Sequence, residues 1–166
     1  MMKHRILRAS PSHWQRVRSV RLRALADAPD AFGSTLDEER QLTDNEWRSR
    51  SENVKVAQFL ALASNGSEVG IAVGAPYSGQ EQTAGLFSMW VAPEARKHGV
   101  GVALVQAVIE WAQSEGYSRI LLDVGNTNAP AISLYRSCGF IPTGQTGTLP
   151  PPRQYIGEHE MERILS

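Results

Sequence analysis

A basic stretch with two glycines, Arg96-Lys97-His98-Gly99-Val100-Gly101, restricts what this chain can fold into more than any other part of its sequence. A hydrophobic run at residues 86–91 precedes it, and a long segment with an apolar face, residues 102–114, follows it. This order predicts a strand, a tight loop and a helix. The first backbone N–H groups of a helix have no intrahelical acceptor, and the helix dipole adds about half a positive charge there. With its basic side chains and open glycine backbone, the stretch predicts a binding site for a diphosphate.

The overall composition is that of one ordinary globular domain, residues 1–166. Seventeen basic residues balance seventeen acidic ones, which gives no support for nucleic acid or an acidic membrane surface as the main partner. No run approaches the roughly 18 apolar residues of a membrane span, and no signal-peptide core follows the first residues. The single cysteine, Cys138, cannot form an internal disulfide, which fits a reducing compartment. We therefore expect a cytoplasmic protein.

Hydrophobic periodicity and turn residues predict strands and helices along the whole chain. The expected strands are residues 6–9, 54–63, 69–75, 83–91, 120–124, 140–143 and 157–165. The expected helices are residues 12–26, 43–51, 99–115 and 129–138, with a turn or two of helix at 36–41. Asn65-Gly66 marks a hairpin, so strands 54–63, 69–75 and 83–91 should form an antiparallel meander. The helix at 99–115 then connects two strands that should pair in parallel. The predicted fold is mixed α/β, a central sheet of about six to seven strands flanked by about four helices.

The same patterns predict several local environments. Ser12 is the expected N-cap of the first helix, and residues 144–152 are expected to form a connecting loop. Phe87 is interpreted as a core residue. A solvated basic face is expected for the four arginines that lie mostly away from the apolar stripe of the first helix, Arg16, Arg18, Arg21 and Arg23.

Two motifs resemble a known family. Val91-Ala92-Pro93 followed by Arg96-x-x-Gly99-x-Gly101 is similar to the acetyl-coenzyme A signature of the GNAT superfamily of N-acetyltransferases. Leu122-Asp123-Val124, the segment from Asn128 to Tyr135 and Cys138-Gly139-Phe140 resemble the strand, asparagine and A-x-x-L-Y-x-x-x-G-F pattern that follow it in that family. Other glycine motifs fit badly, because no Gly-Lys-Ser/Thr follows Gly101 and Leu104 replaces the third small residue of a dinucleotide fingerprint.

The resemblance implies a fold in which the strands at 86–91 and 120–124 splay apart to admit acetyl-CoA. Backbone groups of Met89, Trp90 and Val91 would then contact the pantetheine arm and stabilise the oxyanion. The diphosphate would be bound by the loop residues Arg96, Lys97, His98, Gly99, Val100 and Gly101. Further cofactor contacts would come from Asn128, Ala131 and Tyr135. Tyr135 matches the family tyrosine near the sulfur, where a phenol can protonate the leaving thiolate, and Asn128 can equally be a helix N-cap.

The general base is not defined by the motifs. Many family members carry a glutamate on the fourth strand, where this chain has Ser88, Met89 and Trp90. Glu38 and Glu39 are candidates from the acceptor side, with a solvated helix face as the alternative interpretation. His159 and Glu160 on the last strand, or a water route, are further alternatives.

The resemblance therefore implies an enzyme, an acetyl-CoA-dependent N-acetyltransferase without a metal. Its acceptor would be a primary amine of a small molecule or peptide, attacking the thioester directly in a ternary complex. The acceptor pocket is expected from about residues 27–45 and 144–152. The alternative is a non-catalytic module that senses coenzyme A or an acyl derivative, favoured by the missing strand glutamate. A homodimer is also among the partners that family membership implies.

Overall fold

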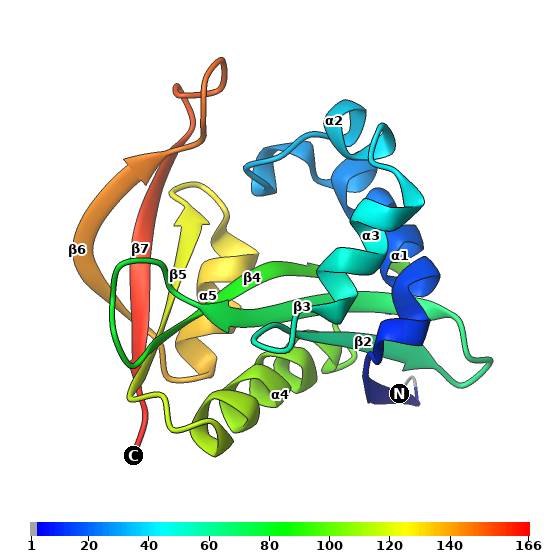
Figure 1. Cartoon of the computed structure of the whole chain (residues 1–166). Helices are drawn as coiled ribbons and strands as arrows, with labels where there is room; N and C mark the ends of the chain where they lie inside the picture. Colours follow the sequence, from blue (N-terminus) through cyan, green and yellow to red (C-terminus); the bar gives the residue numbers. More distant parts are fainter. Residues whose placement is uncertain (1–2) are drawn as a thin grey trace.

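The computed structural model describes residues 3–166 and forms one seven-stranded sheet with the order β1-β2-β3-β4-β5-β7-β6 (Figure 1). The strands are β1 His4–Arg8, β2 Ala57–Ala63, β3 Glu68–Pro76, β4 Thr83–Val91, β5 Arg119–Gly125, β6 Ile141–Thr148 and β7 Gly157–Ile164. The helices are α1 Trp14–Asp27, α2 Leu36–Arg40, α3 Asp44–Glu52, α4 Val100–Ser114 and α5 Ala129–Ser137. Within these described residues, no helix combines the length and apolar character needed to cross a membrane.

Helices cover the two faces of the sheet unequally. Figure 1 shows α1, α2 and α3 on one face and α4 on the other, with α5 beside β5. α4 buries an apolar stripe, which follows the helical periodicity of apolar residues in the sequence. The buried residues of this stripe include Leu104, Val105, Val108, Ile109 and Trp111. Gly74 of β3 makes room for the closest part of this contact, since a Cβ there would lie 2.6 Å from the Trp111 ring. The core therefore lies mainly between α4 and the central strands.

Strands β4 and β5 pair in parallel, as the helical crossover predicts, but only over three residue pairs. The ladder runs from Thr83↔Arg119 to Gly85↔Leu121, whereas β4 continues to Val91 and β5 to Gly125. On its other side β5 stays paired with β7 over its whole length. The two strands therefore separate beyond Gly85, and backbone groups of β4 on the β5 side have no strand partner there. This gap is called the splay below.

A β-bulge distorts β4 at the splay. The β3–β4 register passes from Val73↔Phe87 to Ile71↔Trp90, so one residue of β3 opposes two residues of β4, Ser88 and Met89. Ser88 has φ 59°, a left-handed conformation that is uncommon for a residue other than glycine. Bulges locally interrupt a ladder and redirect side chains, and they are common beside active sites.

The structure confirms the antiparallel meander and the Asn65-Gly66 hairpin, but four local predictions were wrong. A 3₁₀ turn at Pro11–His13 precedes α1, and its capping box is formed by Ser10 rather than Ser12. β2 begins only at Ala57, because Val54 is 92% exposed and lies in a turn. The expected loop at 144–152 is shorter, since β6 extends to Thr148. Phe87 is 41% exposed and stacks against Tyr77 outside the core.

Candidate active site

The start of α4 provides an open backbone site beside the splay. Its N-cap residue, Gly99, has φ 80°, and no atom lies within 4 Å of the position that a Cβ would take. The first turn carries no acidic residue and receives no side-chain cap, so the helix N-terminus keeps its partial positive charge. Gly101 has less room, because a Cβ there would lie 3.1 Å from Cδ2 of Leu134. Only Gly99 therefore borders open space.

The basic side chains of the loop have distinct environments. Arg96 is partly engaged, since its Nε donates to the carbonyl of Val91 at 3.0 Å and its Nη2 to Oδ2 of Asp27 at 2.8 Å. The same carboxylate oxygen accepts from Nε1 of Trp90 at 3.0 Å. The hydrogen bond from Trp90 lowers the pKa of Asp27, against partial burial, and Arg96 lowers it further. Lys97, at φ 65°, is exposed two residues before Gly99. Arg96 thus joins the end of β4 to α1, and Lys97 is the more accessible charge.

The predicted strand contacts lie at the splay. Met89 and Val91 are half-buried, and Trp90 is buried in the core. The Met89 methyl would lie 3.6 Å from a Cβ added at Gly101, so the bulge of β4 lies beside the first turn of α4. The structure therefore brings together the two segments that the sequence assigns to one ligand.

Helix α5 has residues of the second sequence motif at both ends, Asn128 before its first residue and Cys138 after its last. Oδ1 of Asn128 accepts from the backbone N–H of Ala131 at 3.3 Å, so Asn128 is the N-cap that the sequence allowed. Tyr135, 7% exposed, packs edge-on against Phe140 at 6.0 Å between ring centroids. Burial, and secondarily the neighbouring Cys138, raises the pKa of Tyr135, so its hydroxyl stays protonated throughout the ordinary pH range. Among residues 3–166, that hydroxyl makes no hydrogen bond to the protein.

A polar hollow of about 590 Å³ opens on the face of β5, β7 and β6 that does not pack on α5. Its lining includes Tyr77, Arg119, Asp123, Thr143, Glu160 and Glu162. Asp123 lies two residues beyond the last β4–β5 pair, on the same face as Gly85 and Phe87, because strand residues alternate between faces. Asp123 therefore belongs both to the lining of the hollow and to the part of β5 that has separated from β4.

Asp123 is the candidate proton acceptor that the sequence interpretation missed. It lies directly opposite Glu160 on β7, and like charges in that arrangement repel. Glu160 accepts a hydrogen bond from Thr143 at 2.9 Å, whereas Asp123 has no ion-pair or hydrogen-bond partner among the described residues. The Asp123 residue is exposed, and partial desolvation together with the charge of Glu160 raises its pKa. A lone carboxylate within the hydrophobic strand Ile120–Val124 was the available sequence signal.

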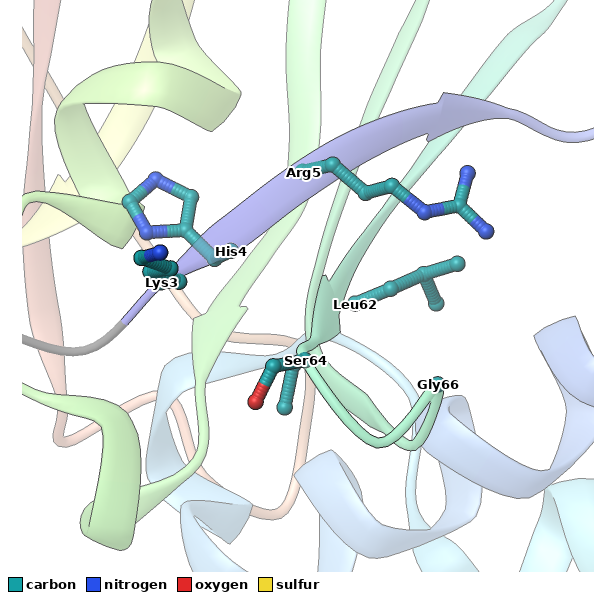
Figure 2. Close-up of a pocket in the computed structure, with 7 residues that line it drawn as sticks. Lys3, His4, Arg5, Leu62, Ser64 and Gly66 are labelled. Atoms are coloured by element: carbon teal, nitrogen blue, oxygen red, sulfur yellow. The ribbon is translucent and has the colours of Figure 1, made fainter.

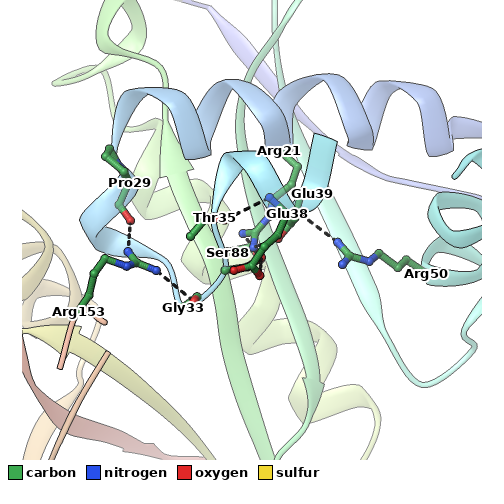
Figure 3. A network of polar contacts seen from close by, with 10 residues as sticks. Arg21, Pro29, Gly33, Thr35, Glu38, Glu39, Arg50, Ser88 and Arg153 are labelled. Atoms are coloured by element: carbon green, nitrogen blue, oxygen red, sulfur yellow. Dashed lines mark hydrogen bonds and ion pairs between the residues drawn. The ribbon is translucent and has the colours of Figure 1, made fainter. Parts of the chain in front are cut away.

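The two glutamates proposed from the sequence occupy different environments. Glu38 is exposed on α2 and its Oε2 accepts from the Ser34 hydroxyl at 3.4 Å. Glu39 is 2% exposed and binds Arg21 through both oxygens, at 3.1 and 2.9 Å (Figure 3). Arg50 donates a third hydrogen bond to Glu39, at 3.1 Å. Burial alone raises the pKa of Glu39, but the hydrogen bonds and charge of Arg21 outweigh it, with smaller contributions from Ser34 and Arg50, and the net pKa is lowered. Glu39 is therefore a poor proton acceptor.

The predicted solvated basic face of α1 is wrong for Arg21, which points inward to Glu39 with 13% of its side chain exposed. The other three arginines form surface ion pairs, Arg16 with Glu68, Arg18 with Asp44 and Arg23 with Glu94. His159, another predicted alternative, lies on the opposite face of β7 from Glu160, with its Nδ1 2.9 Å from Oδ1 of Asn126.

The loop between β6 and β7 bridges the two walls of the predicted acceptor region. Arg153 donates to the carbonyl of Pro29 at 2.6 Å and to that of Gly33 at 3.1 Å (Figure 3). Arg153, which lies one residue beyond the predicted segment 144–152, therefore joins the β6–β7 loop to the segment 27–45.

A smaller hollow, about 240 Å³, lies at the far edge of the sheet. Figure 2 shows it where β1 runs beside the β2–β3 turn, lined by Lys3, His4, Arg5, Leu62, Ala63, Ser64 and Gly66. It shares no residue with the loop, the splay or the polar hollow.

Comparison with known proteins agrees with this geometry. The sequence model described as "Acetyltransferase (GNAT) family" matches residues 21–140. Streptothricin acetyltransferase of Streptomyces lavendulae is 31% identical over 119 residues, which cover 72% of this chain and 62% of that protein. The chain spans 30% to 62% of the length of the first curated relatives that it matches.

Solved structures share the fold over nearly the whole chain. A GCN5-related N-acetyltransferase from Kribbella flavida superposes with a TM-score of 0.76 at 28% identity, covering 98% of both chains. The fold is also that of a phosphinothricin acetyltransferase from Sinorhizobium meliloti in complex with AcCoA, with a TM-score of 0.82, 19% identity and coverage of 99% and 90%. The family match extends over most of the chain and includes the α4 loop, the splay and α5. This chain belongs to the acetyltransferase (GNAT) family.

Proposed function

We propose that this protein transfers the acetyl group of acetyl-CoA to a primary amine of a small molecule or peptide, by direct attack of the amine in a ternary complex. The observation that carries the proposal is the proximity of the splay to the start of α4. β4 loses its partner β5 beyond Gly85, and its bulge at Met89 lies beside the first turn of α4, where Gly99 leaves open space.

The residues present fit acetyl-CoA. The uncapped N–H groups from Val100 onward suit a diphosphate, with Lys97 as the nearest accessible cation. The unpaired backbone between Met89 and Val91 suits the amide groups of the pantetheine arm, which can hydrogen-bond as an added strand does. Asn128 and Ala131 at the start of α5 are the proposed further contacts. Acetyl-CoA supplies the acetyl group as an activated thioester.

The site offers the proton transfers that the reaction needs. An ordinary alkyl amine has a pKa of about 10.4, so it must lose a proton before it attacks. Asp123, unpaired and with a raised pKa, accepts that proton from the side of the polar hollow. Backbone N–H groups in the β4 bulge stabilise the developing oxyanion. Tyr135 donates its hydroxyl proton to the departing sulfur.

Asp123 replaces Glu39 as the preferred base because their electrostatic environments are opposite. Two arginines keep Glu39 ionised and fully hydrogen-bonded, whereas a second carboxylate faces Asp123 and favours proton uptake. Exposed Glu38 remains the alternative acceptor-side carboxylate. The similarity to streptothricin acetyltransferase supports a small-molecule acceptor.

Replacing Gly99 by Asp should weaken acetyl-CoA binding by about tenfold or more, which corresponds to about 1.4 kcal/mol. The added carboxylate would occupy the open space at the helix start and repel the diphosphate, while aspartate tolerates the left-handed backbone better than most residues. In thermal unfolding, ligand at about 100 times its dissociation constant should stabilise the wild type by about 2.7 kcal/mol. Isothermal titration of the variant measures the loss directly.

The matched control is Gly99→Asn, which has nearly the same shape and backbone preference without the charge. It should retain binding within about threefold, a change of well under 1 kcal/mol. Gly101→Asp is less informative, because its side chain also collides with Leu134. Equal affinities of the Asp and Asn variants would overturn the assignment of the diphosphate to this loop. Release of free thiol from acetyl-CoA with a panel of amines then separates an enzyme from a sensor, which binds without turnover.

A further inference from the structure

Glu39 is the only charged side chain that is buried among residues 3–166, and the proposed reaction does not use it. Both of its oxygens accept hydrogen bonds from Arg21, and Arg50 adds a third at 3.1 Å. Arg21 also lies over the Phe32 ring, with its guanidinium carbon 4.7 Å from the ring centroid. A buried ion pair gives little net stability over a hydrophobic replacement, so its geometry can matter more than its energy.

The remaining nitrogen of the Arg21 guanidinium connects this ion pair to β4. Its Nη1 donates to Oγ of Ser88 at 3.0 Å (Figure 3). Ser88 is the residue with φ 59° in the bulge, next to Met89. One planar group therefore binds a buried carboxylate on one side and the distorted residue of the strand on the other. Lysine has no second or third nitrogen with which to make both contacts.

We propose that the Arg21–Glu39 ion pair positions the oxyanion-stabilising backbone of β4, by holding Ser88 in the bulge conformation through its hydroxyl. Arg21 and Glu39 are thus positioning residues and touch neither substrate. The inference rests on the proposed acetyl transfer, since the bulge is where that reaction places the developing oxyanion.

Several structural features support a positioning role for this contact. The left-handed conformation of Ser88 costs free energy and persists only if its surroundings hold it. The β-ladder does not hold it, because the register omits Ser88 and Met89 on the β3 side and pairing with β5 has already ended. Arg21 is the side chain that the structure shows bonded to Ser88. A donor displaced by about 1 Å can lose 100-fold in rate.

The test compares turnover in full-length variants in which different parts of this connection are removed. Ser88→Ala deletes the hydroxyl and leaves the buried ion pair intact, so the protein should fold normally. Glu39→Gln keeps the side-chain shape but releases Arg21. Each variant should lower kcat by about 10- to 100-fold, with the KM for acetyl-CoA within about threefold of wild type, because the lost interaction forms in the transition state. The double variant should be no slower than the slower single variant, as expected for residues that act as a unit.

The matched control is Glu68→Gln. Glu68 also forms an ion pair with an α1 arginine, Arg16, at 2.8 Å, but neither side chain is hydrogen-bonded to β4. Its kcat should stay within about twofold of wild type even if its melting temperature falls as far as that of Glu39→Gln. Unchanged kcat in Ser88→Ala, additive losses in the double variant, or an equal loss in Glu68→Gln would each overturn the proposal.

A structural measurement tests the positioning role of Arg21 and Glu39 independently of the proposed acetyl transfer. The backbone amide resonances of residues 88–90 should shift in Glu39→Gln and Ser88→Ala and stay in place in Glu68→Gln, whether or not any amine is acetylated. Unmoved resonances in the first two variants contradict the positioning role. A wild type that releases no thiol with any amine, but shows the expected shifts, contradicts the acetyl transfer alone.

Discussion

Asp123→Asn should lower the turnover of acetyl transfer by about 10²- to 10⁴-fold, the usual range for a general base. Asparagine keeps the shape and hydrogen-bonding capacity of the side chain but cannot accept the amine proton. It also relieves the repulsion from Glu160 across β5 and β7, so the variant should be at least as stable as the wild type. Loss of rate without loss of stability would distinguish a chemical role from a structural one.

The pH dependence provides a second measurement of Asp123. Its pKa is raised above the ordinary value for aspartate by desolvation and by Glu160, and only the ionised form accepts a proton. The wild-type rate should therefore rise as the pH increases through that raised pKa. This rise in rate should be absent in Asp123→Asn. Glu38→Gln serves as the control, and its profile should match that of wild type. If Asp123→Asn turns over at the wild-type rate, or if the rise with pH is lost in Glu38→Gln instead, the proton acceptor is Glu38 or water rather than Asp123.

Tyr135→Phe should lower turnover by about 10²-fold, at the low end for a general acid, because a thiolate is already a fair leaving group. The variant keeps the buried ring and its edge-on contact with Phe140, so packing should survive. The affinity for acetyl-CoA should change little, since the lost interaction forms mainly in the transition state. Single-turnover kinetics, which exclude product release, provide the measurement.

The identity of the acyl donor tests this role of Tyr135 more closely. A thioester of a more acidic thiol needs less help from a proton donor, so the difference between wild type and Tyr135→Phe should shrink with such a donor. Burial raises the pKa of Tyr135, so the hydroxyl should remain protonated at pH 9. A difference that does not depend on the thiol, or no difference at all, would make Tyr135 a packing residue.

The sequence by itself determined the elements whose signals are local. The strand, glycine loop and helix at 86–114 follow from hydrophobic periodicity and from Gly99, whose left-handed conformation is specified by its own lack of a side chain. The Asn128 cap and the Asn65-Gly66 hairpin are equally local. The parallel order of β4 and β5 follows from the crossover helix between them. These signals also carried the family resemblance.

Tertiary structure decided the chemistry of the individual side chains, because charge environment depends on residues far apart in the sequence. Asp123 became a candidate base through its register with Glu160, 37 residues further along the chain, and no local pattern fixes that register. Glu39 and Arg21 look like surface residues of two polar helices, yet packing of α2 against α1 buries Glu39 and leaves only 13% of the Arg21 side chain exposed. Ser88 acquired its conformation from a bulge that only the pairing of β3 and β4 defines. The sequence thus predicted where the proposed ligand-binding backbone lies, whereas only the fold shows that Asp123 faces a second carboxylate and that Glu39 is held by two arginines.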